Sequence, residues 1–222
     1  LGPLKPTSSP EYRDYPLTYA KGSSVKCVDD TLSRRISFEM MIPHKAVMKR
    51  TLGDALLAER SRMLIQAISN RLYKSGKSAS VSNSWYLADK EHFVISVSGG
   101  TEEAVEEDFV EAVAELYRLA DEGFCEGEMD IVRSRSADHI GGRRGQNSYV
   151  ICDDIAETAI LDDRNVTDPE QCEFLCAEVL ATSSSDLQMI LNAWLEAAED
   201  TRLVAYRFNS NMSSALTVAD VD

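Results

Sequence analysis

The chain has 222 residues, 44% of them hydrophobic, and its 23 basic and 37 acidic side chains give a formal net charge of −14. A chain of this size can bury a core without disulfides or metal ions, and its acidic balance argues against binding to nucleic acid, which needs positively charged surfaces. No apolar run approaches the roughly 18 residues of a transmembrane helix, so we expect no transmembrane segment. The chain begins Leu-Gly-Pro, and we expect a piece of a longer polypeptide.

The first predicted elements are a linker and two strands. Residues 1–23 contain four prolines within their first 16 residues, which is typical of an extended segment leading from a preceding domain. Short apolar runs predict strands over 25–28 and 36–42, and Pro43 is expected to end the second.

The next segment predicts a long helix followed by a hairpin. Apolar residues recur at steps of three and four over 51–72, which is the helical period. Two runs over 79–87 and 93–98 are predicted strands, joined by a turn at Asp89-Lys90-Glu91 and followed by Gly99-Gly100. A hairpin implies antiparallel pairing in this part of the sheet.

The second half of the chain is predicted to be mostly helical. Thr101 is a suitable N-cap for a helix over 101–122, with two glutamates in its first turn and Gly123 as its C-terminal stop. The remaining predictions, in chain order, are helices over 126–140, 148–161, 167–180 and 183–196, a strand over 201–208, and a linker over 209–222 to a following domain. The resulting fold class is α+β: a mostly antiparallel sheet with helices packed on one face, spanning residues 24–208.

The three histidines argue against metal catalysis by this chain. His44, His92 and His139 are far apart in the sequence, and neither H-x-x-E-H nor H-E-x-x-H occurs. Two histidines within one helical turn and a nearby glutamate are the usual way to bind Zn²⁺ and activate its water. We expect His92 and His139 to be exposed, and we assign no catalytic or metal-binding residue.

Cysteines also indicate no special chemistry. The five are too scattered for a disulfide framework. Cys172 and Cys176 are spaced to share one helix face, where they are either half of a metal site or, as we favour, small buried side chains.

A basic segment is the most unusual local feature of this acidic chain. Gly141-Gly142-Arg143-Arg144-Gly145 follows a predicted helix that also carries Arg133 and Arg135. Arginines beside glycines can bind a carboxylate, so Arg133, Arg135, Arg143 and Arg144 are candidate contacts to a partner domain or a substrate. The alternative, which we favour, is a flexible connection with solvated arginines.

Several motifs in this order resemble the pitrilysin/insulinase (inverzincin) family of zinc peptidases. They are Asn70-Arg71-Leu72 at the end of the long helix, Gly99-Gly100-Thr101 after the hairpin, the stretch from Gly123 through Glu128 to Arg133, and Ser184-Ser185-Asp186-Leu187 before the last strand. The resemblance covers residues 24–208 and implies a pitrilysin/mitochondrial-processing-peptidase-like domain. Some family members grip substrate with an arginine and a tyrosine seven residues later, but Ser78 stands seven residues after Arg71 here.

The resemblance implies an inactive domain that pairs with an H-x-x-E-H domain of the same polypeptide and helps to enclose a peptide or protein substrate. Zinc is then expected in the partner domain and no cofactor in this one, while the parent is expected to be a zinc-dependent metalloendopeptidase. The family also points to the bacterial cell envelope or periplasm. The alternative is a freestanding protein-interaction module with no peptidase partner.

Overall fold

The structure is a computed structural model, and it describes residues 22–87, 90–142, 148–161 and 166–210. Regular elements account for most of these residues, and their order along the chain is strands, helix, hairpin, five helices and a final strand. They are β1 Ser24–Asp29, β2 Ile36–Lys45, α1 Leu52–Lys74, β3 Ala79–Leu87, β4 Lys90–Gly99, α2 Glu102–Glu122, α3 Glu126–Gly142, α4 Ser148–Leu161, α5 Pro169–Leu180, α6 Ser184–Thr201 and β5 Leu203–Phe208.

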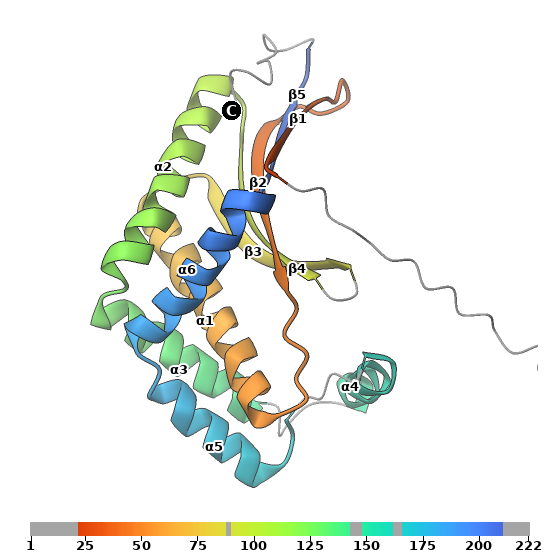
Figure 1. Ribbon diagram of the computed structural model, residues 1–222, viewed down its shortest axis with the longest axis vertical. Coiled ribbons are helices and arrows are strands. Elements are labelled where there is room, and N and C mark those ends of the chain that lie inside the picture. The colour runs from red at the N-terminus through yellow and green to blue at the C-terminus, as the bar shows by residue number, and fades with distance from the viewer. Residues whose placement is uncertain (1–21, 88–89, 143–147, 162–165, 211–222) are drawn as a thin grey trace, which may run out of the picture.

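The strands form one sheet in the order β1-β5-β2-β4-β3 (Figure 1). Neighbouring strands are antiparallel except β1 and β5, which run parallel with Ser24 opposite Leu203. The prediction of a mostly antiparallel sheet is therefore confirmed. The parallel pair places the first and last described strands side by side, so the two ends of the described chain meet in one sheet.

Helices cover one face of this sheet (Figure 1). Side chains two residues apart on a strand point to the same side of the sheet, so one face can be apolar. In β2, Phe38, Met40 and Ile42 are buried on the side that the helices cover. Helices α1, α2 and α6 pack against the sheet, and α3 and α5 pack on α1. Helix α4 lies apart from the other helices in Figure 1.

The core lies between the sheet and the helical layer. Its largest cluster combines side chains of β2, β4 and all the helices that pack together, including the fully buried Ile42, Leu64, Phe93, Leu116 and Met129. A smaller cluster at the other end of the sheet surrounds Tyr206, whose hydroxyl donates a hydrogen bond to Glu102 at 2.8 Å.

Side-chain caps begin three of the helices. The Asp54 backbone N–H donates to the Thr51 hydroxyl at 3.1 Å, and the Thr51 backbone N–H donates to the Asp54 carboxylate at 2.9 Å. The same reciprocal arrangement joins Ser183 and Asp186 at the start of α6. Asp168 caps α5, with Pro169 in its first turn. Such caps satisfy backbone donors that have no partner inside the helix.

Several predicted boundaries were wrong: α3 continues from the predicted end at residue 140 to Gly142, β5 begins at Leu203 and not at residue 201, and three others differ more. Strand β2 continues through Pro43 to Lys45, because β5 pairs only with Ser37–Met41 and leaves the rest of β2 as an edge, where proline is tolerated. Lys90 and Glu91 belong to β4 and not to a turn. Helix α6 continues beyond Glu196 to Thr201.

The predicted linkers fall largely outside the described residues. Residues 1–21 and 211–222 are among those that the structure leaves undescribed, so the linkers over 1–23 and 209–222 stay predictions. Asn209 is buried, and its side-chain amide donates to the carbonyls of Thr31 and Ser33 at 3.1 and 2.7 Å. It therefore joins the end of β5 to the turn between β1 and β2.

Two leucines on α1 give a test of this packing. Leu64 is fully buried in the core, whereas Leu57 is 42% exposed. We expect Leu64→Ala to lower the free energy of unfolding by about 2–5 kcal/mol, because it removes buried methyl groups and leaves a cavity. Leu57→Ala is the matched control and should cost less than about 1 kcal/mol. Urea unfolding followed by circular dichroism measures both values, and equal losses would contradict the assigned faces of α1.

Candidate functional site

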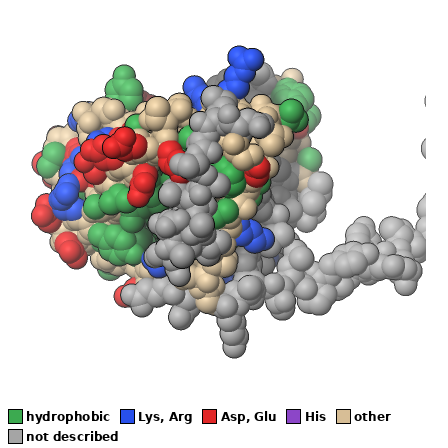
Figure 2. All heavy atoms as spheres, turned by 90° about the horizontal axis from the view of Figure 1, so that it is seen from above, with side chains coloured by type: hydrophobic (Ala, Val, Ile, Leu, Met, Phe, Trp, Pro, Cys, Tyr) green, Lys and Arg blue, Asp and Glu red, His purple; other side chains and the backbone are tan. Residues whose placement is uncertain are grey.

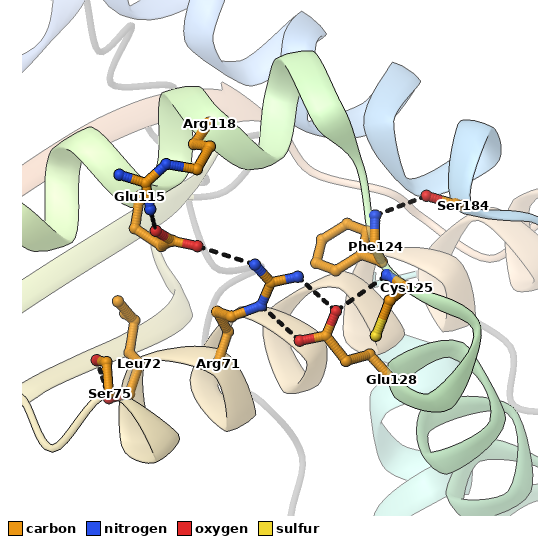
Figure 3. Close-up of polar contacts among 9 residues, drawn as sticks. All are labelled: Arg71, Leu72, Ser75, Glu115, Arg118, Phe124, Cys125, Glu128 and Ser184. Carbon is orange, nitrogen blue, oxygen red and sulfur yellow. Dashed lines mark hydrogen bonds and ion pairs between the residues drawn. The ribbon is translucent and has the colours of Figure 1, made fainter.

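A buried ion pair joins α1 to α3 (Figure 3). The Arg71 guanidinium donates through Nε and Nη2 to the two carboxylate oxygens of Glu128, both at 2.5 Å. Its Nη1 donates to Glu115 of α2 at 3.0 Å. The Glu128 side chain is only 7% exposed. A two-pronged bond to a buried carboxylate has strict geometry, so this pair sets the relative position of three helices.

The turn between α2 and α3 is held at the same place. Gly123 ends α2 with φ of 78°, in the left-handed region that favours glycine, and a Cβ there would lie 2.5 Å from the Ser184 hydroxyl oxygen. That hydroxyl accepts the Phe124 backbone N–H at 2.7 Å, and Glu128 accepts the Cys125 backbone N–H at 3.0 Å. We call Arg71, Glu115, Gly123, Glu128 and Ser184 the polar junction.

The polar junction brings together three motifs that carry the family resemblance in the sequence. Arg71, the stretch that begins at Gly123, and Ser184 are separated by tens of residues and meet here (Figure 3). Hydrogen bonds from Arg71 hold the pKa of Glu128 below its usual value, and Glu128 in turn raises the pKa of Arg71. Both groups are thus charged at neutral pH and engaged with each other, which indicates a structural role.

The candidate arginines are not equivalent. Arg133 is half-buried: its Nε donates to the Thr182 carbonyl at 2.8 Å, and its Nη1 pairs with Glu126 and Asp130. It therefore ties α3 to the connection between α5 and α6. Arg135 is exposed on α3, with a 3.4 Å contact from Nη1 to Asn70. Arg143 and Arg144 lie outside the described residues.

The histidines lie in three different settings. His139 is exposed, as predicted, with Nδ1 3.7 Å from the Glu59 carboxylate. The expectation that His92 is exposed was wrong: it is 8% exposed, because it lies within β4 opposite Pro43. Burial, together with the charge of nearby His44, lowers the pKa of His92. Among the residues that the structure describes, no group of three or more His, Cys, Asp or Glu side chains is placed to hold a metal ion.

A groove with a volume of about 730 Å³ lies between α1, α6 and the end of β2. We call it the β2–α6 groove. The His44 ring forms part of its wall and stacks on Trp194 of α6, with ring centroids 4.4 Å apart, while His44 Nε2 lies 2.8 Å from the Asn83 side-chain oxygen. Arg60 and Asp186 form an ion pair at 3.3 Å across one end.

The sequence did not predict this groove. Its residues come from four separate elements, and most are apolar side chains that the helical and strand periods assign to ordinary packing. The one available signal was the pair of lysines, Lys45 and Lys90, which becomes meaningful only when the register places them opposite each other.

Charge is distributed unevenly over the surface. Seen from above, acidic side chains gather beside apolar ones on the side of the helical layer (Figure 2). Helix α2 contributes to this acidic character with Glu102, Glu103, Glu106 and Glu107 in its first two turns. Among the helices that the structure describes, none has both the length and the apolar character needed to span a bilayer.

The polar junction predicts a large difference between two arginines. Arg71→Met removes the cation from buried Glu128, and we expect the free energy of unfolding to fall by about 3–5 kcal/mol. Arg118→Met is the control, because Arg118 also pairs with Glu115 but is 54% exposed, and it should change stability by no more than about 0.5 kcal/mol. Urea unfolding measures both. Similar values for the two variants would show that the junction does not hold the helices.

Two comparisons of the sequence gave no match. No family model matches it, and no curated protein matches it.

Solved structures do match. The first half of the periplasmic protease PqqL from Escherichia coli superposes with a TM-score of 0.78 at 15% identity, over 95% of this chain and 47% of that one. The ferredoxin protease FusC, solved with Arabidopsis ferredoxin, gives 0.72 at 12% identity over 97% of this chain and 25% of that one. The inactive domain of an M16 peptidase from Pseudomonas fluorescens gives 0.59 at 11% identity, over 89% and 46%.

This chain thus spans about half of the PqqL fragment and about a quarter of FusC. The matches cover nearly all of this chain, and they include structures described as proteases and one described as an inactive domain. The fold that the sequence motifs indicated is thereby confirmed: this chain has the fold of a peptidase domain of the M16, or pitrilysin/insulinase, family.

Proposed function

We propose that this chain is a catalytically inactive domain of a multi-domain zinc metallopeptidase. In this role it pairs with an H-x-x-E-H domain of the same polypeptide and forms part of the wall around a peptide substrate. The observation that carries the proposal is the combination of an M16 domain fold with a sequence that has no H-x-x-E-H.

The lengths of the matched structures support a partner domain. The superposition covers 95% of this chain but only 47% of the PqqL fragment, which leaves room in that fragment for a second domain of similar size. The inactive M16 domain from Pseudomonas fluorescens is matched over a similar share, 46%. The partner domain would supply the zinc, which lowers the pKa of a bound water and so generates the nucleophile.

This chain's own part is then contact and confinement. Arg135 is exposed on α3, and with Arg143 and Arg144 it remains a candidate contact to the partner domain or the substrate. Arg133 is engaged within the domain and acts there by holding α3 in place. Because PqqL is a periplasmic protease, we extend the proposal to the bacterial cell envelope or periplasm.

The alternative is a freestanding protein-interaction module. The apolar β2–α6 groove favours this alternative, because such a surface can bind another protein. The two proposals differ in what the parent polypeptide contains. An H-x-x-E-H motif before or after this segment supports the peptidase proposal, and its absence from the whole parent supports the freestanding module.

The first test measures zinc and activity. We expect this chain alone to contain far less than one zinc per molecule and to cleave no peptide, because it lacks the histidine pair. When it is mixed with the H-x-x-E-H region of its parent, the two should elute together in size-exclusion chromatography, and peptide hydrolysis should rise above that of either piece. Near-equimolar zinc in this chain alone, with hydrolysis that a chelator abolishes, would contradict the proposal.

The second test concerns the basic segment. In the parent protein, Arg143→Ala with Arg144→Ala should weaken domain association or turnover at least tenfold at low salt, since a charge-assisted bond contributes about 1.5–3 kcal/mol. Exposed charges are screened by salt, so the effect should shrink as ionic strength rises. The matched control is Arg34→Ala with Arg35→Ala, an adjacent exposed pair before β2. If both double variants behave like the unaltered protein, the segment is a solvated connection.

A further inference from the structure

The β2–α6 groove has an apolar lining that is open to solvent. Met189 of α6 is 65% exposed and Leu57 of α1 is 42% exposed, and both line it beside Trp194 and Ile190. Large apolar side chains that line one hollow together are a feature of binding surfaces, whereas single exposed ones are common everywhere. The groove is thus shaped for apolar groups of a ligand.

Two lysines line this groove. Lys45, the last residue of β2, is the direct partner of Lys90, the first residue of β4. Side chains at directly opposite positions have Cβ atoms only about 5 Å apart, and like charges there are unfavourable. In the part of the chain that the structure describes, neither lysine has an acidic partner. By contrast Lys77, in the turn after α1, is paired with Asp108 and Glu111.

The other acidic and basic side chains among the groove residues, Arg60 and Asp186, are already engaged. Arg60 and Asp186 pair with each other, and Asp186 also accepts from Ser183. Glu91, next to Lys90, accepts a hydrogen bond from the Asn83 amide at 2.6 Å. The groove residues therefore carry three basic groups and one acidic group in a chain with a net charge of −14. This local excess of positive charge is complementary to carboxylates.

We infer that the β2–α6 groove binds a peptide segment whose apolar side chains are followed by acidic ones. The apolar residues lie against Trp194, Met189 and Leu57, and an Asp or Glu carboxylate lies between Lys45 and Lys90, where it relieves their repulsion. This binding needs neither zinc nor a parent peptidase, so it goes beyond the proposed function and can fail independently of it.

The experiment uses this chain and a fluorescein-labelled, C-terminally amidated peptide of about ten residues, with leucines followed by a run of glutamates. One comparison peptide has lysines in place of the glutamates, another has serines in place of the leucines, and a third ends in a free carboxylate. Fluorescence anisotropy should show at least tenfold tighter binding of the leucine–glutamate peptide than of the lysine and serine peptides. The free carboxylate should add less than the glutamate run does.

Variants locate the binding. Lys45→Glu with Lys90→Glu should weaken it at least tenfold, whereas Lys26→Glu with Lys74→Glu makes the same charge change at exposed positions away from the groove and should have little effect. Met189→Gln removes an apolar contact without changing the charge and should also weaken binding, whereas Tyr73→Gln, at an exposed side chain on α1 outside the groove, should not. Thermal melting of each variant shows whether it folds.

A measurement on the unaltered chain guards against variants that do not fold. Its affinity for the leucine–glutamate peptide should fall as salt is raised, because the carboxylate–lysine contact is exposed to screening. The inference is overturned if no peptide binds, if acidic and basic peptides bind equally, or if the Lys45/Lys90 variant folds and binds like the unaltered chain. Binding that Met189→Gln leaves unchanged would place the peptide elsewhere and would equally overturn it.

Discussion

The arrangement of the helical layer depends on the ion pair between Arg71 and Glu128. A carboxylate that is 7% exposed must have a charged or hydrogen-bonded partner, because an unpaired buried charge costs several kcal/mol. Arg71 meets this need with two parallel bonds and reaches Glu115 with its third nitrogen. These contacts join α1, α2 and α3 at one point, so the pair contributes to the relative placement of the three helices as well as to stability.

Helix α1 connects the polar junction to the β2–α6 groove. Its C-terminal end carries Arg71, and its N-terminal half carries Leu57 and Arg60, which line the β2–α6 groove. The polar junction is closed by internal contacts, whereas the groove presents apolar and basic groups to solvent. Such a division suits a domain that works through contacts: a fixed frame holds a surface whose residues have few internal partners.

Periodicity in the sequence was sufficient for most elements. The stripe on α1 and the position of Thr101 before α2 each depend on neighbours within a few positions, so they were predicted correctly, although the Thr101 side chain makes no capping hydrogen bond. Features that depend on distant partners were not. Pro43 lies within a strand because β5 pairs only with the first part of β2. His92 is buried because it lies within β4, opposite Pro43. The family motifs named Arg71 and Glu128, but only the fold shows that they are bonded across 57 positions. The β2–α6 groove has no local signal, since its walls are assembled from separate elements.

A double-mutant cycle on the two residues of this pair tests the account most directly. Arg71→Met, Glu128→Gln and the combined variant are unfolded in urea beside the unaltered chain, and the coupling energy is obtained from the four free energies. Residues that interact directly couple by about 0.5–3 kcal/mol, and the structure predicts a value near the upper end because the bond is two-pronged and the carboxylate is buried. Losses that simply add, with no coupling, would show that Arg71 and Glu128 do not bind each other and that another contact orders the helices.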